Sequence, residues 1–96
     1  MSLIHISNGR IDEISSEREN TLVTVTYRGM TGGPNSRRNE QTVRLVVSPR
    51  TIILNTNGVP VPASALNTGM IINAFISPAM TRSIPPQTTA FEVRVL

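Results

Sequence analysis

The chain has 96 residues, of which 39% are hydrophobic and 3% aromatic, and its formal net charge is +3. A chain of this length has room for one core, so we expect a single domain over residues 1–96. The absence of cysteine excludes disulfides, thiolate nucleophiles and cysteine-ligated zinc. No run approaches the ~20 apolar residues of a membrane helix, so we expect no membrane insertion.

Residues 4–14 predict a long first strand that is bent or bulged at Gly9. The isoleucines of this stretch are interrupted by Asn8 and Gly9, and a glycine inside a strand often marks a bulge. The polar stretch 15–20 follows and predicts a turn.

Two strands with clean alternation come next. Within residues 21–28, one face carries Val23, Val25 and Tyr27 and the other carries Thr24, Thr26 and Arg28. Residues 42–47 repeat the pattern, with Val43, Leu45 and Val47 inward and Arg44 outward. Between them, residues 29–41 are rich in glycine, asparagine and arginine, which predicts an exposed loop.

An insertion follows the third strand. Residues 51–61 predict a short hairpin around Asn57 and Gly58, a pair typical of a type I′ turn. Pro60 confines the return strand to a sheet edge, because proline lacks the backbone N–H. Residues 62–66 begin with proline and predict a single helical turn.

Two further strands complete the chain. Residues 70–76 are nearly all apolar and predict a central strand covered on both sides, and residues 77–87 contain three prolines and predict a loop. Residues 88–96 predict the last strand, with Phe91, Val93 and Val95 inward.

Together these elements predict an all-β fold, a small five-stranded Greek-key barrel of the oligonucleotide/oligosaccharide-binding (OB) type with an inserted short hairpin and one helical turn. An open sandwich or roll would give almost the same pattern. The predicted core consists of Val23, Val25, Leu45, Ile72, Phe75, Phe91 and Val93.

The segment Ser77-Pro78-Ala79-Met80-Thr81-Arg82-Ser83-Ile84-Pro85-Pro86-Gln87 resembles a group of small OB-like β-barrel domains of unknown function in exported proteins of Gram-positive bacteria. The resemblance extends more weakly to residues 9–11 and 48–51, and to Leu66 with Gly69. It implies an exported or cell-envelope location and carries no activity with it.

The sequence favours a non-enzymatic protein. His5 is the only histidine, and with Asp12 and a hydroxyl residue it formally completes a nucleophilic triad, but a solvated imidazole at a strand edge explains it more simply. Asp12 and Glu13 are adjacent, so on a strand we expect them on opposite faces, unable to work as a pair. One imidazole and no cysteine also argue against a metal site, and no cofactor is expected.

The leading hypothesis is a binding or protein-interaction module that uses its proline-rich loop. Prolines restrict the backbone, so we expect residues 77–87 to form an ordered lip with Arg82 as the contact residue. Met80 and Ile84 flank Arg82 with apolar groups and suit a protein or polymer partner that offers an apolar patch and a carboxylate or phosphate. The alternative is that Met80 and Ile84 plug the open end of the barrel while Arg82 bonds to nearby carbonyls.

The runner-up is a nucleic-acid-binding barrel with an arginine-rich face. Arg28 and Arg44 are expected on the outward face of the second and third strands, and Arg37 and Arg38 in the loop that joins them. No aromatic residue alternates onto that face, so stacking platforms for bases are missing. The sequence leaves the oligomeric state open, a homo-oligomer included.

Overall fold

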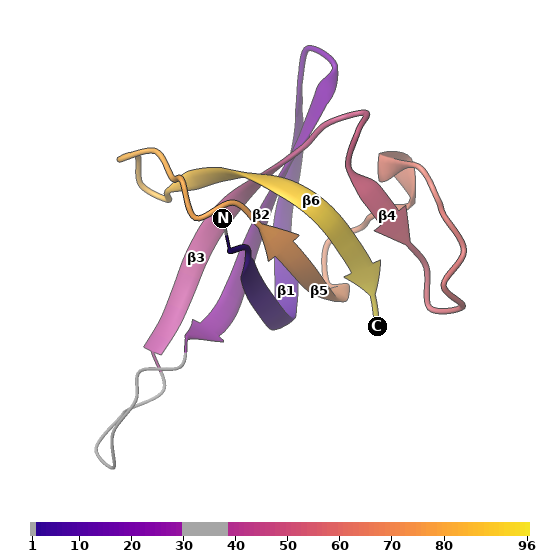
Figure 1. Ribbon diagram of the computed structural model, residues 1–96, viewed down its shortest axis with the longest axis horizontal. Coiled ribbons are helices and arrows are strands. Elements are labelled where there is room, and N and C mark those ends of the chain that lie inside the picture. The colour runs from indigo at the N-terminus through magenta and orange to yellow at the C-terminus, as the bar shows by residue number, and fades with distance from the viewer. Residues whose placement is uncertain (1, 30–38) are drawn as a thin grey trace.

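The computed structural model describes residues 2–29 and 39–96, and these form six β-strands and one 3-10 turn (Figure 1). The elements are β1 (Ile4–Glu17), β2 (Asn20–Gly29), β3 (Asn39–Val47), β4 (Ile52–Leu54), the 3-10 turn η1 (Ala63–Ala65), β5 (Ile71–Ile76) and β6 (Gln87–Val95). The strands pair in the order β3-β2-β1-β5-β6-β4, and β3 also pairs with β6. Five strands therefore close into a barrel, with β4 as an extra strand, which confirms the predicted fold class.

The core comes from the alternating faces of the strands. On β2 and β3 the predicted inward residues other than Tyr27 are buried, because these strands contain no bulge: they are Val23, Val25, Val43, Leu45 and Val47. Tyr27, near the end of β2, is half-buried. Isoleucines of β1 and β5 fill much of the rest of the barrel, together with Val93 of β6, and each fully buried aliphatic side chain contributes ~1.5–3 kcal/mol relative to exposure. No helix in the described part of the chain is long and apolar enough to cross a membrane.

β1 bends strongly and belongs to both walls of the barrel. Its first residues pair with β5, and from Arg10 onward it pairs with β2. The predicted bulge lies beside Gly9, but the left-handed residue is Asn8, with φ 55°. The side chain of Asn73 on β5 compensates for the interrupted ladder, because its Oδ1 accepts a hydrogen bond of 3.0 Å from the backbone N–H of Asn8.

A second bulge in β1 falls at Asp12. Ile11 pairs with Val25 whereas Glu13 pairs with Thr24, so Asp12 is the additional residue. The expected opposite placement of Asp12 and Glu13 is therefore wrong: the bulge turns both side chains to the solvent on the outer face.

Two turns differ from the sequence prediction. β1 continues to Glu17, so the turn before β2 is confined to Arg18 and Glu19, with Arg18 at φ 57°. In the predicted hairpin, residues 51–61, only Gly58 has positive φ, so the turn is not type I′. The N–H of Gly58 instead donates to the carbonyl of Asn55, as in a three-residue loop that ends on a left-handed glycine.

Two residues that were predicted in the core, Phe75 of β5 and Phe91 of β6, lie outside it. β5 alternates, with Ile72, Ala74 and Ile76 buried, so it is covered on one face and not on both; Phe75 is 39% exposed. In β6, Ala90 pairs with Ile76 and Glu92 with Phe75. Phe91 is thus the extra residue of a bulge and is 44% exposed, while Val93 returns to the core.

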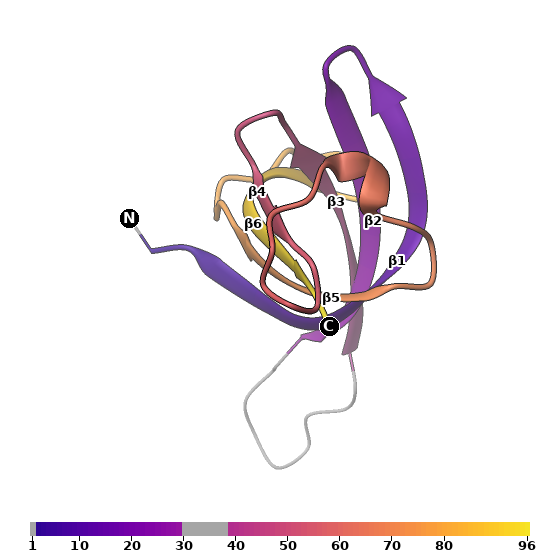
Figure 2. The same cartoon turned by 90° about the vertical axis from the view of Figure 1, so that its right-hand side faces the viewer.

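The two ends of the barrel differ in what covers them. The insertion between β3 and β5, residues 48–70, lies across one end and buries Ile53 and Leu66 (Figure 2). At the other end β1, β3 and β6 begin while β2 and β5 stop. The loop between β5 and β6, residues 77–86, lies on that side of the molecule, away from the insertion (Figure 1).

Candidate functional site at the barrel mouth

A hollow of about 650 Å³ opens at the barrel end that the insertion leaves uncovered. We call this hollow the mouth. Its lining residues come from β1, β2, β3 and the 77–86 loop: Ile4, His5, Ser7, Tyr27, Arg28, Gln41, Thr42, Val43, Met80 and Pro86. Within residues 2–29 and 39–96, Arg28 is the one charged residue of this lining, so the described part of the mouth combines apolar walls with one positive group.

The 77–86 loop is held by hydrogen bonds within itself and to β6. The N–H of Thr81 donates to the carbonyl of Gln87 (2.9 Å), and the Thr81 hydroxyl accepts from the N–H of Gln87 (3.0 Å). The buried hydroxyl of Thr88 lies 2.7 Å from the carbonyl oxygen of Ser77 and 3.0 Å from that of Ala79. The loop is therefore fixed on both of its sides, as expected for an ordered lip.

Three residues of the loop were predicted to contact a partner. Met80 lines the mouth and is 37% exposed, whereas Ile84 projects away from the protein with 99% of its surface exposed. Arg82 is exposed, and among the described residues no side-chain hydrogen bond or ion pair holds its guanidinium. The plug alternative is therefore wrong for Ile84, which fills no part of the barrel end.

Of the predicted arginine face, the structure describes Arg28 and Arg44, and both lie on the outer face of β2 and β3. Arg28 is exposed at the mouth, and Arg44 is half-buried on β3, where its backbone N–H donates to the carbonyl of Pro86 (2.8 Å). Arg37 and Arg38 lie outside the described residues. The structure thus brings Arg28 together with Met80, one residue from each of the two predicted surfaces.

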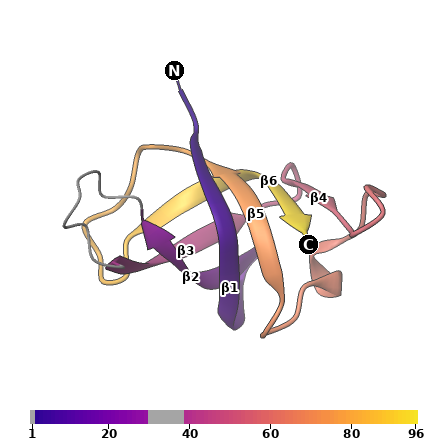
Figure 3. The ribbon, with the colours of Figure 1, turned by 90° about the horizontal axis from the view of Figure 1, so that it is seen from below.

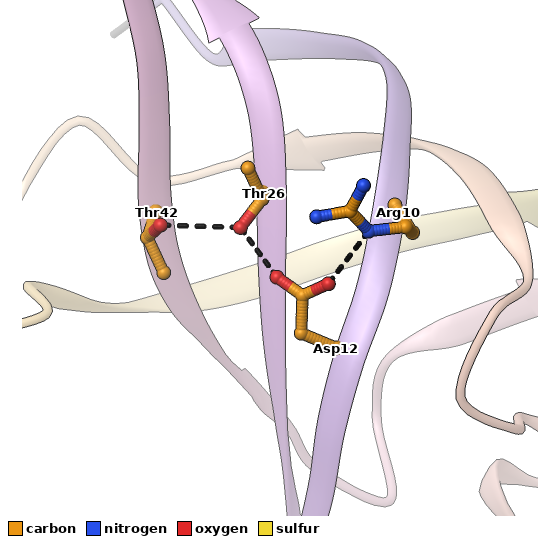
Figure 4. A network of polar contacts seen from close by, with 4 residues as sticks. All are labelled: Arg10, Asp12, Thr26 and Thr42. Carbon is orange, nitrogen blue, oxygen red and sulfur yellow. Dashed lines mark hydrogen bonds and ion pairs between the residues drawn. The ribbon is translucent and has the colours of Figure 1, made fainter.

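A polar network crosses the outer face of β1, β2 and β3 (Figure 4). Arg10 Nε donates to Asp12 Oδ1 at 2.7 Å, the hydroxyl of Thr26 donates to Asp12 Oδ2, and the hydroxyls of Thr26 and Thr42 are 3.1 Å apart. The hydrogen bond from Thr26, followed by that from Arg10, holds the pKa of Asp12 below its ordinary value. Asp12 is therefore ionised at neutral pH, and both of its carboxylate oxygens accept a hydrogen bond.

The charges on this outer face are mixed. In the described residues the guanidinium groups of Arg10, Arg28 and Arg44 share the face with carboxylates of Asp12, Glu13 and Glu40. Glu40 pairs with Arg28 across the ladder. A surface that mixes arginines with carboxylates attracts phosphate less strongly than a purely basic one.

His5 and Tyr27 are the site residues that sequence reasoning missed. His5 stacks on Phe75 with ring centroids 4.7 Å apart, and its Nδ1 lies 3.3 Å from the Ser7 hydroxyl. The Tyr27 hydroxyl donates to Gln41 Oε1 (2.9 Å), and burial raises the pKa of Tyr27. Alternation predicted Tyr27 inward but not beside an opening, and the position of His5 depends on the bend of β1, which the sequence pattern does not show.

Comparison with protein-family models, with curated proteins and with solved structures found no match to this chain. In residues 2–29 and 39–96, no three histidine or carboxylate side chains lie close enough together to hold a metal ion. The site is therefore interpreted from its own geometry.

Proposed function

We propose that this chain is a non-enzymatic binding module that binds an apolar segment of a protein partner across its 77–86 loop and the adjoining mouth. The observation that carries the proposal is Ile84, whose side chain is 99% exposed on a hydrogen-bonded loop. Burial of an aliphatic side chain of this size gains ~1.5–3 kcal/mol. Because the loop is already ordered, a partner that covers Ile84 gains this energy at little entropic cost.

The mouth beside the loop supports the same interpretation. Ile4, Val43, Met80 and Pro86 supply apolar surface, and Arg28 supplies a charged donor that binds carboxylates strongly. Methionine adapts its shape to different apolar groups. This combination suits a protein segment that presents apolar side chains and an acidic group.

The closed five-stranded barrel is compatible with an OB-type fold, and OB barrels bind ligands with the face of their second and third strands and with adjoining loops. The resemblance of residues 77–87 to domains of exported Gram-positive proteins adds a location. We place the partner in the cell envelope on that resemblance alone.

Nucleic acid is the less favoured ligand. The carboxylates of Asp12, Glu13 and Glu40 interrupt the predicted basic face, and the exposed rings of His5 and Phe75 lie beyond it, on the β1–β5 side. Oligonucleotide binding through phosphates would require a basic surface free of such acids.

Selection from a synthetic library of random heptapeptides with blocked ends tests the proposal. Replacing Ile84 by Ser is expected to weaken the selected peptides about tenfold or more and to leave stability within ~0.5 kcal/mol. Ile52, which is 53% exposed on β4 in the insertion, provides the matched control: Ile52→Ser should change affinity less than about twofold.

The proposal fails if no peptide is enriched, or if both substitutions act equally. A twelve-residue oligothymidylate is the second probe. Binding whose logarithm falls with log salt at a slope of about −2 or steeper would replace the proposal with the nucleic-acid alternative.

A further inference from the structure

The barrel wall is open between β1 and β2 beside the mouth. The ladder between these strands runs from Glu17 and Asn20 to Arg10 and Thr26 and shows no pair beyond. In the described residues, positions 4–6 of β1 pair with β5 alone, and positions 27–29 of β2 pair with β3 alone. Among the residues that the structure describes, each strand therefore presents an unpaired backbone edge to the gap, and Figure 3 shows the N-terminal part of β1 leaving the barrel wall.

The gap is accompanied by continuous open space. A second hollow of about 520 Å³ lies along the outer face, and it shares Ser7, Tyr27 and Arg28 with the mouth. Because the two hollows share these residues, they adjoin along the ends of β1 and β2, and we call the pair the cleft. An extended chain of five or so residues, ~16 Å long, is the form of ligand that follows such a cleft.

We propose that an extended, acidic peptide segment of the partner binds in this cleft as an added strand on the unpaired edge of residues 4–6. The inference rests on the proposed function and names its ligand. Unpaired strand edges bind extended chains through backbone hydrogen bonds, while alternate side chains enter adjoining pockets. Here one set of alternate side chains enters the mouth, against Tyr27 and Met80.

The positive charge of Arg28 favours an acidic side chain in the peptide. Arg28 lines both hollows; Glu40, opposite it in the ladder, lines the second hollow, and no carboxylate of residues 2–29 or 39–96 lines the mouth. In the second hollow Arg10 is held by Asp12 and Glu40 adds a negative charge, so an acid is favoured only on the mouth side. A glutamate or aspartate of the peptide, directed to the mouth, pairs there with Arg28 across the cleft.

Backbone N-methylation of a peptide selected from the blocked library tests the added strand. In a strand paired along one edge, only alternate amides donate to the partner. Methylation at alternate positions should therefore weaken binding about tenfold or more, and methylation at the intervening positions about threefold or less. On the protein, alternate amides of residues 4–6 should exchange with solvent more slowly in the complex.

Arg28→Gln should weaken an acidic peptide about tenfold, while Arg94→Gln, on the exposed face of β6, should change affinity less than about twofold. A peptide that depends on Ile84 but tolerates methylation at every position overturns the added strand and leaves the proposed function standing. Selected peptides without enrichment of aspartate or glutamate, or equal effects of the two arginine substitutions, overturn the acidic preference.

Discussion

Gly9 shows how closely β1 and β2 approach at the bend. It is buried, and a Cβ added to it would lie 2.5 Å from Val25 Cγ1 and 3.2 Å from Ile6 Cγ2. Val25 is itself buried and stiff about χ1, so it has little room to move aside. We expect Gly9→Ala to lower the free energy of unfolding by ~1–3 kcal/mol, measured by urea denaturation.

A double-mutant cycle of Gly9→Ala and Val25→Ala tests whether a clash with Val25 causes this loss of stability. Val25→Ala alone leaves a cavity, but in the double variant the new methyl group at residue 9 occupies part of that space. The double variant should therefore be more stable than the sum of the single losses predicts, by ~1 kcal/mol. Strict additivity would contradict the steric explanation.

The elements show where sequence patterns succeed and where they fail. β2 and β3 were predicted with their inward faces, because a strand without irregularity keeps its period of two. β1 and β6 each contain bulges, at which one extra residue shifts the pattern to the other face. Nothing in the residue types around Asp12 or Phe91 announces this shift, since bulges depend on how a strand curves to close the barrel.

The effect of the β6 bulge on stability can be measured at Phe91. A place in the core would make Phe91→Ala cost ~3–5 kcal/mol, but the bulge leaves the ring 44% exposed. We now expect Phe91→Ala to lower the free energy of unfolding by less than ~1.5 kcal/mol. Leu45→Ala, at a fully buried position, should cost ~2–5 kcal/mol. Similar losses in thermal denaturation of the two variants would mean that β6 keeps its regular register.

At the scale of the whole molecule, the candidate site was predictable only in pieces. The proline content of residues 77–87 predicted an ordered loop, and alternation predicted an outward Arg28. The joining of Met80 and Arg28 in one hollow depends on barrel closure through β3 and β6, a parallel pairing between segments far apart in the chain. His5 joins them only because β1 bends at Asn8, which a linear pattern does not show.

The division of the barrel into one covered and one open end leads to the last prediction. Leu66, in the insertion, is 4% exposed and packs with the core at the covered end, so Leu66→Ala should lower the free energy of unfolding by ~2–5 kcal/mol. The peptide site lies at the opposite end. Below the melting temperature, selected peptides should therefore bind this variant within about twofold of the original affinity, measured by calorimetry. Ile52→Ala, exposed in the same insertion, should change stability by less than ~0.5 kcal/mol. A Leu66→Ala variant that unfolds normally but no longer binds would show that the insertion, and not the mouth, holds the peptide.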